Sequence, residues 1–225
     1  MVEAQHVAST MKIVDDADEQ MLLEALLDAS KPPLANATAG LDYLLASPFR
    51  YPPRHGGSRF RDANAPGVFY GAQHVRTACA ELGYWRWKFL QDAVDLSRIE
   101  PVAHAAFSVD VSAPAVDLRV PPFDRDAAVW MHPAAYPPCQ EFAAIARGVD
   151  LGCIVYQSVR DPQKAWCVAV LTPEAFATAV AGIPAFAAPL SRNAPRHPRR
   201  HPAGCRSGSG RAFAGPGWRT ARRWS

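Results

Sequence analysis

The 225-residue sequence predicts an α+β domain, with strands and helices mixed along the chain. One long segment carries apolar residues at helical spacing, and several short apolar runs have the length and alternation of strands. These elements follow one another without the regular strand–helix–strand period of a doubly wound fold. Hydrophobic residues make up 49% of the chain and charged residues 20%, which is typical of a chain that folds around a core.

The N-terminal part predicts a helix that ends at a pair of prolines. Carboxylates within Asp15–Glu19 suit a helix start, because they complement the positive end of the helix dipole. Leucines follow at helical spacing between Leu22 and Leu27, and Lys31–Pro33 ends the segment. We therefore expect residues 1–40 to be a helical extension whose leucines add to the core.

The main domain is expected to span residues 41–190. Residues 41–45 predict one or two helical turns. Residues 49–53 are expected to be extended, because a proline excludes the helical region for the residue before it.

The longest helix is expected from about residue 72 to about residue 91. Its apolar residues recur at intervals of three and four, which predicts one buried face: Val75, Ala78, Cys79, Leu82, Trp85 and Phe89. A neighbouring stripe contains His74, Thr77, Glu81 and Tyr84. Glu81 is therefore expected at the edge of the buried face, where a carboxylate could face a pocket.

The second half of the chain predicts strands around one helix. Four segments have strand patterns: 105–111, 116–120, 152–156 and 166–171. Residues 137–148 predict a helix, with prolines tolerated in its first turn and a glycine at its end. The sequence Thr172-Pro173-Glu174 predicts the start of a further helix, with a hydroxyl cap and a proline at the first position.

Residues 191–225 differ from the rest of the chain in composition. They hold nine arginines but no lysine, no acid and no Val, Ile, Leu or Met, whereas residues 1–190 carry 15 basic and 21 acidic residues, a net charge of −6. We expect a disordered basic tail. It could be an arm that binds nucleic acid, or the product of a GC-rich gene read out of frame, which yields arginine without lysine. We favour the frameshift.

Several common kinds of site are not predicted. The five cysteines contain no C-x-x-C pair: Cys79, Cys139, Cys153, Cys167 and Cys205. Several of them lie in apolar periodic segments, where a small buried thiol is the expected state. The histidines lack the spacing of metal ligands, so no metal site is expected. No Walker-type loop, glycine-rich dinucleotide fingerprint or serine-hydrolase motif is present. Without a secretory signal or an uninterrupted apolar span, the protein is expected to be cytoplasmic.

Three polar residues stand eleven residues apart and on three kinds of predicted structure: Arg59 after a Gly-Gly turn, Tyr70 at the end of a short apolar strand, and Glu81 inside the long helix. Together they could supply an anion fork, an aromatic platform and a carboxylate to a charged, ring-containing ligand. Each also has a simpler interpretation, as a surface arginine, a tyrosine that covers the core, or a solvated helix glutamate.

Two further residues are candidates for ligand binding. Arg50 lies in Phe49-Arg50-Tyr51 and could bind an anion or pair with a surface acid. Ser158 ends a predicted strand and opens a loop, a common place for a hydroxyl that contacts a ligand and an equally common turn position.

The order of these motifs resembles the RES domain family. Five segments carry the resemblance: Phe49-Arg50-Tyr51, Gly57-Ser58-Arg59-Phe60, the stretch 67–72, the stretch 77–81, and Ile154-Val155-Tyr156-Gln157-Ser158. The arginine, glutamate and serine that name the family are matched by Arg59, Glu81 and Ser158. The similarity covers about Tyr43 to Phe176 and does not extend to the tail, where the family continues with ordinary sequence.

The resemblance implies a fold and an activity. RES proteins are toxins of bacterial RES–Xre toxin–antitoxin pairs; they resemble ADP-ribosyltransferases in fold, with small mixed sheets and flanking helices, and they consume NAD. It also implies a partner, a helix-turn-helix antitoxin of the Xre type that binds the toxin and blocks its pocket, so that DNA is contacted only through the antitoxin. NAD is then a substrate, and neither a metal nor a membrane is involved.

The residue chemistry fits cleavage of the nicotinamide–ribose bond, in which positive charge develops on the ribose. We expect Glu81 to stabilise that charge, Arg59 with Arg50 as a second candidate to hold the pyrophosphate or carboxamide, Tyr70 to stack on the nicotinamide, and Ser158 to bond ribose or phosphate. Water, phosphate and a protein side chain all remain possible acceptors. The alternative hypothesis is a catalytically decayed or truncated RES protein that serves only as a binding module for the antitoxin. A third, weaker hypothesis treats the basic tail as a nucleic-acid arm.

Overall fold

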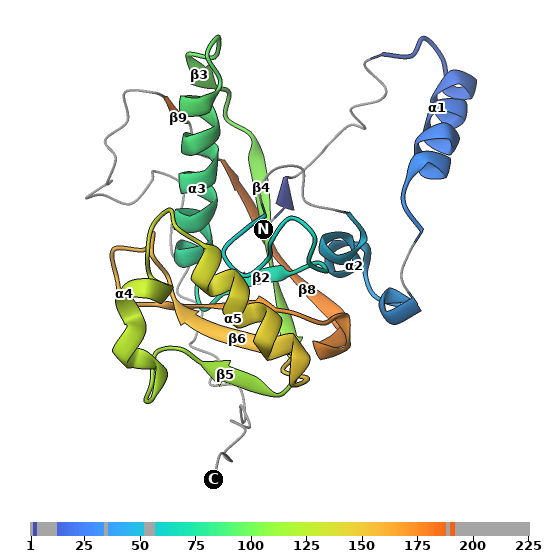
Figure 1. Ribbon diagram of the computed structural model, residues 1–225. Coiled ribbons are helices and arrows are strands. Elements are labelled where there is room, and N and C mark those ends of the chain that lie inside the picture. Colours follow the sequence, from blue (N-terminus) through green and yellow to red (C-terminus); the bar gives the residue numbers. More distant parts are fainter. Residues whose placement is uncertain (1, 4–12, 34–35, 52–56, 188–189, 192–225) are drawn as a thin grey trace.

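The computed structural model describes residues 2–3, 13–33, 36–51, 57–187 and 190–191 (Figure 1). The predicted basic tail lies outside the described residues, apart from Ser191. At the centre is a four-stranded sheet in the order β2-β7-β6-β5, made of β2 (Phe69–Ala72), β7 (Trp166–Val170), β6 (Cys153–Gln157) and β5 (Ala115–Asp117). β7 is antiparallel to both of its neighbours, while β5 is parallel to β6. The mixed sheet with flanking helices confirms the predicted α+β class.

The two central strands are apolar throughout because both faces of the sheet are buried. Ile154 of β6 and Ala169 of β7 lie on the face covered by α5 (Pro137–Gly148), in a cluster that includes Cys139. Val155 and Val168 alternate to the opposite face, in a second cluster. A strand buried on both faces has no polar side, which explains why these segments read as continuous apolar runs.

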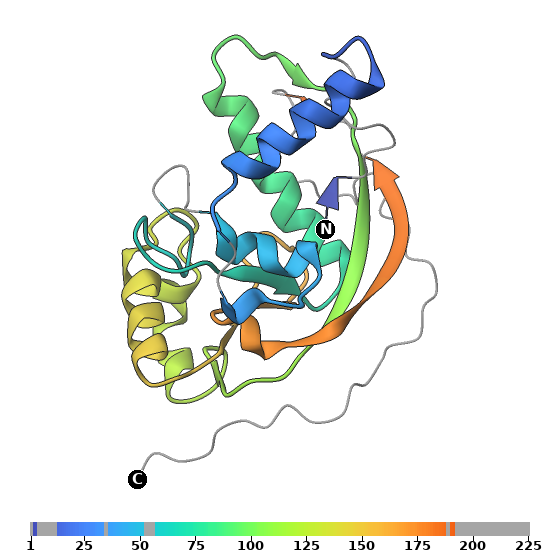
Figure 2. The same cartoon turned by 90° about the vertical axis from the view of Figure 1, so that its right-hand side faces the viewer.

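A second sheet covers the face opposite α5. β4 (Ala103–Val111) pairs with β8 (Phe176–Ala187) in a long antiparallel ribbon, and β1 (Val2–Glu3) pairs with β4 on its other side. Figure 2 shows this ribbon curving along one side of the molecule, with α5 on the other side of the central sheet. Phe69 joins the two sheets. Its ring packs edge-on against the Phe176 ring, with the centroids 5.1 Å apart, and its centroid lies 6.3 Å from the centroid of the Phe107 ring.

The remaining elements lie at the edges of these layers. The helices are α1 (Ala17–Ser30), α2 (Tyr43–Arg50), α3 (Val75–Asp92) and α4 (Ala127–Trp130), with short 3₁₀ turns at Asn36–Thr38, Phe123–Asp126 and Pro173–Ala175. The strand pair β3 (Arg98–Ile99) and β9 (Leu190–Ser191) lies beyond the end of α3. Helices predicted near 72–91 and 137–148 are confirmed as α3 and α5.

Two predictions about helix boundaries are wrong. Phe49 and Arg50 are helical and Tyr51 is extended (φ −104°, ψ 134°), because the steric restriction before Pro52 reaches back one residue. The rest of the predicted extended segment, residues 52–53, lies outside the described residues. At residues 172–174 the predicted helix is a single 3₁₀ turn that leads into β8. Pairing of β8 along β4 overrides the local helix-start signal.

The predicted strand over 116–120 is also too long. β5 ends at Asp117, because Arg119 turns back on that residue and donates its backbone N–H and two guanidinium nitrogens to the Asp117 carboxylate. This short loop closes one end of the central sheet.

The predicted buried face of α3 is wrong at several positions, although Cys79 is buried as predicted, and the predicted core contribution of α1 is wrong. In α3 the buried residues are Thr77, Cys79 and Leu90, whereas Trp85 and Phe89 are 45% and 60% exposed. Figures 1 and 2 show α3 projecting beyond the central sheet, so the central sheet does not cover its far half. α1 stands apart from the sheets and buries no residue, so its leucines do not extend the core.

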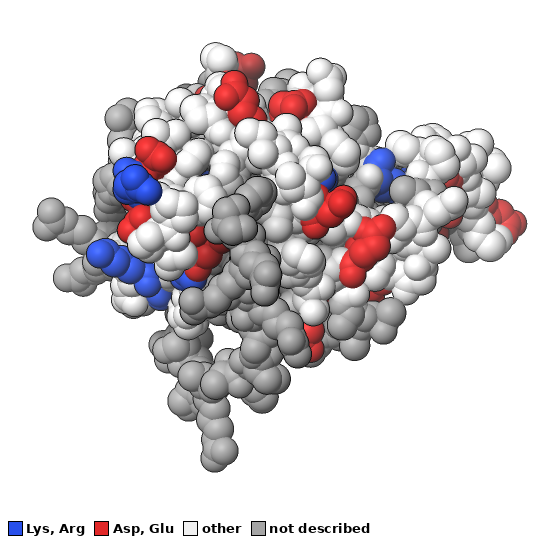
Figure 3. Space-filling model, turned by 60° about the horizontal axis from the view of Figure 1, so that its bottom comes forward, with Lys and Arg blue, Asp and Glu red and all other residues white. Residues whose placement is uncertain are grey.

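The charged side chains give no sign of a nucleic-acid surface on the face seen in Figure 3. Acidic side chains are spread over that face, and no continuous patch of Lys and Arg covers it. This distribution agrees with the net negative charge of residues 1–190.

The contact between α2 and the loop before β2 depends on a glycine. A Cβ atom at Gly67 would lie 2.3 Å from the Pro48 carbonyl oxygen and 2.4 Å from the Phe49 Cα, whereas a Cβ at Gly83 in α3 would meet nothing within 4 Å. We predict that Gly67→Ala lowers the free energy of unfolding by about 1–3 kcal/mol, because backbone atoms must move apart.

The matched control is Gly83→Ala, which should raise the free energy of unfolding by about 0.5–1 kcal/mol, since alanine loses less entropy in a helix. Urea denaturation of both variants measures these changes. Equal effects of the two substitutions would contradict the close packing at Gly67.

Candidate active site

The loop after β6 lies along the first half of α3 and contacts it at three successive positions of one stripe. Nearest the start of the helix, the Thr77 hydroxyl donates to the Asp161 carboxylate (2.7 Å). One turn further, the Ser158 hydroxyl donates to Oε1 of Glu81 (2.6 Å). Beyond it, the guanidinium of Arg160 stacks over the Tyr84 ring, with its Cζ 3.3 Å from the ring centroid.

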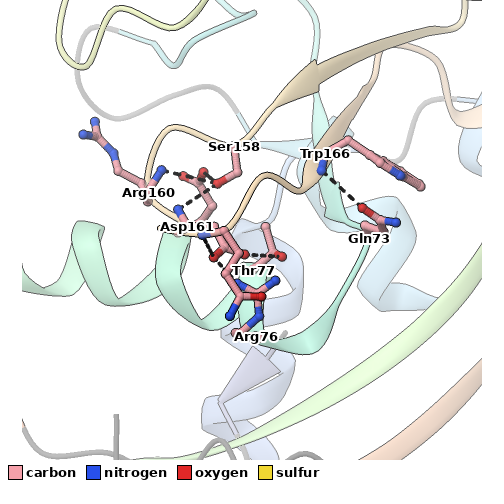
Figure 4. A network of polar contacts seen from close by, with 9 residues as sticks. Gln73, Arg76, Thr77, Ser158, Arg160, Asp161 and Trp166 are labelled. Atoms are coloured by element: carbon pink, nitrogen blue, oxygen red, sulfur yellow. Dashed lines mark hydrogen bonds and ion pairs between the residues drawn. The ribbon is translucent and has the colours of Figure 1, made fainter. Parts of the chain in front are cut away.

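The hydroxyl of Ser158 is aimed at Glu81 by its own loop. The backbone N–H groups of Arg160 (3.3 Å) and Asp161 (3.1 Å) donate to Ser158 Oγ, as Figure 4 shows. These two bonds occupy the lone-pair side of the oxygen and leave its one proton for the carboxylate. Ser158 is only 3% exposed, so this geometry is fixed inside the protein.

Asp161 anchors the loop to the helix. Its side chain is fully buried and accepts hydrogen bonds from Thr77, from the backbone N–H of Gln163 and from the guanidinium of Arg76, with which it forms an ion pair (Figure 4). A buried carboxylate is stable only with such a full set of partners.

Arg59 lies in a tight turn that three other elements hold in place. Gly57 begins the turn with a φ of +81°, and the backbone groups of Ser58 and Arg61 bond to each other across it. From α5, Gln140 Nε2 donates to both the Ser58 and the Arg61 carbonyl oxygens (2.9 and 3.2 Å). Phe60 is fully buried and packs edge-on against Tyr156 (centroids 4.9 Å apart).

Tyr70 on β2 fastens the same turn. Its hydroxyl accepts from the Phe60 backbone N–H (3.0 Å) and shares a hydrogen bond with Ser58 Oγ (2.8 Å). Burial of the hydroxyl raises the pKa of Tyr70, an effect opposed by these two bonds and by the nearby charges of Arg59 and Arg61. The residue is nevertheless 38% exposed, so its ring faces outward while its hydroxyl is tied inside.

The guanidinium of Arg59 contacts the loop that follows α4. Nη1 donates to the carbonyl oxygens of Trp130 (2.7 Å) and His132 (3.0 Å), and the guanidinium lies over the Tyr136 ring with its Cζ 4.8 Å from the centroid. Arg59 is 8% exposed. The guanidinium of Arg59 therefore holds the loop 130–136 in place.

Tyr156 connects the two halves of the site. Burial raises the pKa of Tyr156 well above its ordinary value, the neighbouring Tyr70 and Glu81 raise it further, and the charge of Arg59 lowers it. Tyr70, Glu81 and Arg59 are thus all close enough to Tyr156 to shift the pKa of its phenol. Arg59, Tyr70, Glu81 and Ser158 lie together around the end of β6.

Arg50 points to a different part of the chain. Its Nε donates to the carbonyl oxygen of Pro32, and its guanidinium lies beside the ring of Tyr51. The structure thus brings together four of the five residues singled out in the sequence, but not Arg50.

Sequence reasoning missed the residues that hold this cluster. Gln140 and Tyr156 carry no local signal, because their partners are distant in the chain. The spacing of Ser158 and Asp161 could have been recognised, since a hydroxyl residue followed three positions later by an acid is typical of a side chain that caps the intervening backbone.

Two cavities lie near the cluster without containing it. One of about 300 Å³ lies beside the Arg59 turn and is lined by Phe60, Gln140 and Arg147, among others. Another of about 400 Å³ is lined by residues of the exposed half of α3, including Trp85 and Phe89. Glu81 and Ser158 line neither of these two cavities.

Other chemistry receives no support from the described residues. Within them, no group of three or more His, Cys, Asp or Glu side chains could hold a metal ion. The four described cysteines are buried thiols, as expected, and burial raises the pKa of Cys153 to about 11 and that of Cys167 to about 12, against thiolate formation. No helix in the described part of the chain is long and apolar enough to cross a membrane.

The anchor at Asp161 gives a stability prediction. Asp161→Ala should lower the free energy of unfolding by about 3 kcal/mol, because it leaves Arg76 and Thr77 without their buried partner. Asp92→Ala is the matched control, since Asp92 pairs with Lys88 on the exposed side of the same helix and should change little. Urea denaturation compares the two, and an equal loss would contradict the anchoring role.

Comparison with known proteins identifies the domain. A family model described as the RES domain matches residues 33–191, which is more than half of the chain and includes every residue of this cluster. No curated protein sequence matches the chain.

Proposed function

Since the chain belongs to the RES domain family, we propose that it consumes NAD by cleaving the bond between nicotinamide and ribose. Membership of this family supports NAD-related enzymatic activity in general. The observation that carries the specific proposal is the hydrogen bond from Ser158 to Glu81, which fixes a carboxylate at the end of β6, the strand that carries Tyr156.

The reaction needs a fixed negative charge more than it needs an acid. Loss of nicotinamide leaves the ribose with oxocarbenium character, so a carboxylate near the ring is more favourable in the transition state than in the ground state. Nicotinamide in NAD is already cationic and leaves as a neutral molecule, so a strong general acid is unnecessary. Glu81 is the carboxylate that supplies this stabilisation in the proposal.

Ser158 makes the carboxylate a preorganised group. Because two backbone N–H groups hold the Ser158 oxygen and its hydroxyl donates a hydrogen bond to Glu81, the carboxylate does not have to reorient when charge develops. Ser158 thus positions Glu81. Because its hydroxyl already makes three hydrogen bonds and the residue is only 3% exposed, we do not assign it the ribose or phosphate contact expected from the sequence.

Tyr70 and Arg59 form the other side of the proposed site. The Tyr70 ring is outward-facing and immobilised through its hydroxyl, which suits a platform for the nicotinamide ring. Arg59 has five N–H donors, and the two carbonyl contacts use those on Nη1. Its other nitrogens are the donors we assign to the carboxamide or the nearer phosphate. Arg50 is left out of this assignment because it faces Pro32.

The biological setting is also a proposal. We propose that the chain is the toxin of a cytoplasmic RES–Xre pair and that a helix-turn-helix antitoxin restrains it by covering the surface around Glu81. RES domains are generally paired with an antitoxin, which supports this part of the proposal.

The proposal predicts that Glu81→Gln lowers the rate of NAD loss by about 10²–10³-fold, because the substitution removes the charge and keeps the shape. The assay measures NAD and free nicotinamide in the presence and absence of phosphate, and the mass of the ADP-ribosyl product distinguishes water, phosphate and protein as acceptors.

Glu141→Gln, on the exposed side of α5, is the control and should match the parent. Parent-like turnover by Glu81→Gln would refute the assignment of Glu81. A parent that binds but does not consume NAD would favour a decayed enzyme.

A further inference from the structure

Arg160 is a cation beside the Ser158–Glu81 pair, and it has no role in the cleavage chemistry proposed above. It lies in the loop between β6 and β7, two residues after Ser158, and its backbone N–H donates to the Ser158 hydroxyl. Figure 4 shows its side chain directed away from Asp161 and Thr77, to the other side of the loop. The side chain is thus free of the network that anchors this loop to α3.

The guanidinium of Arg160 lies about one helical turn from Glu81. It stacks on Tyr84, which follows Glu81 by three positions and therefore lies on the same face of α3. Its Nη2 donates to the carbonyl oxygen of Pro133, in the loop that Arg59 contacts at Trp130 and His132. The two arginines thus approach the loop 130–136 at neighbouring positions.

The charge of Arg160 is not neutralised within the described part of the chain. Its partners there are an aromatic ring and a carbonyl oxygen, whereas Arg76, Arg98 and Arg119 each form an ion pair with a carboxylate. Arg160 is also partly exposed, while Arg59 is almost buried against backbone carbonyls. Arg160 is therefore a partly exposed cation whose charge is available to an anionic ligand that lies against Glu81 and Tyr84.

We propose that Arg160 binds the diphosphate of the dinucleotide, with Tyr84 as the ring on which its guanidinium rests. This inference rests on the proposed function and moves the main phosphate contact from Arg59 to Arg160. The ribose that reacts at Glu81 is joined to the diphosphate through one methylene group, so the phosphates lie near the next turn of α3, about 5.4 Å along the helix. An arginine held flat on an aromatic ring presents its edge, which suits a two-point contact with phosphate oxygens.

Binding of ADP-ribose tests this inference without any need for turnover. Calorimetry with the full chain should show that Arg160→Ala weakens ADP-ribose about 10–100-fold, as expected for loss of a charged hydrogen-bonded contact, and that Arg160→Lys restores part of the affinity. Arg98→Ala, which removes an exposed arginine paired with Glu100 beyond α3, should leave the affinity unchanged.

Turnover separates a phosphate contact from a structural role. In Arg160→Ala, kcat/KM should fall about 10–100-fold for NAD, mostly through KM, and by less than about twofold for nicotinamide riboside, which has the same scissile bond and no phosphate. Equal losses on both substrates, or unchanged ADP-ribose affinity, would overturn the inference.

Failure of the proposed function would have a different outcome. If the parent consumed neither substrate and still bound ADP-ribose in an Arg160-dependent way, NAD cleavage would be refuted and the Arg160 site supported. If the parent bound no ADP-ribose, the Arg160 site would be refuted.

Discussion

The hydrogen bond between Ser158 and Glu81 joins the two parts of the molecule on which the site depends. Ser158 comes from the end of β6, a central strand with core on both faces, and Glu81 comes from a helix that projects beyond the sheet. The bond forms because the loop after β6 follows one stripe of α3, and Asp161 fixes that course with a buried ion pair. Everything proposed about catalysis requires this loop to stay on this helix.

Hydrogen bonds fix the two parts of the site that the proposed reaction uses, the Ser158–Glu81 pair and the Arg59 turn. Backbone N–H groups hold the Ser158 oxygen, while Gln140 and the Tyr70 hydroxyl hold the Arg59 turn. Such groups need not reorganise when charge develops in a reaction, which is the basis of electrostatic catalysis. The two cations differ in this respect, because Arg59 is fixed to backbone carbonyls and Arg160 rests on an aromatic ring at the surface.

Much of this arrangement could be predicted from the sequence. The apolar runs of β6 and β7 indicated buried strands, and the spacing of Thr77, Glu81 and Tyr84 indicated one polar stripe on α3. The structure places a partner from the loop after β6 on each of these three residues. The family was also recognised from short motifs, and the match over residues 33–191 confirms it.

Other features could not be predicted because they depend on contacts distant in the chain. The exposure of Trp85 and Phe89 follows from where α3 leaves the sheet, and helical periodicity carries no information on that. The burial of Arg59 depends on carbonyl oxygens more than 70 residues away. The single 3₁₀ turn at residues 173–175 gives way to β8 because β4 offers a pairing edge, which local propensity does not reveal.

A double-mutant cycle on NAD turnover tests the central claim most directly, with Ser158→Ala, Glu81→Gln and the two combined. If the serine acts by fixing the carboxylate, the double variant should lose no more activity than Glu81→Gln alone. Losses that multiply would show that the two residues act independently, and would contradict the account.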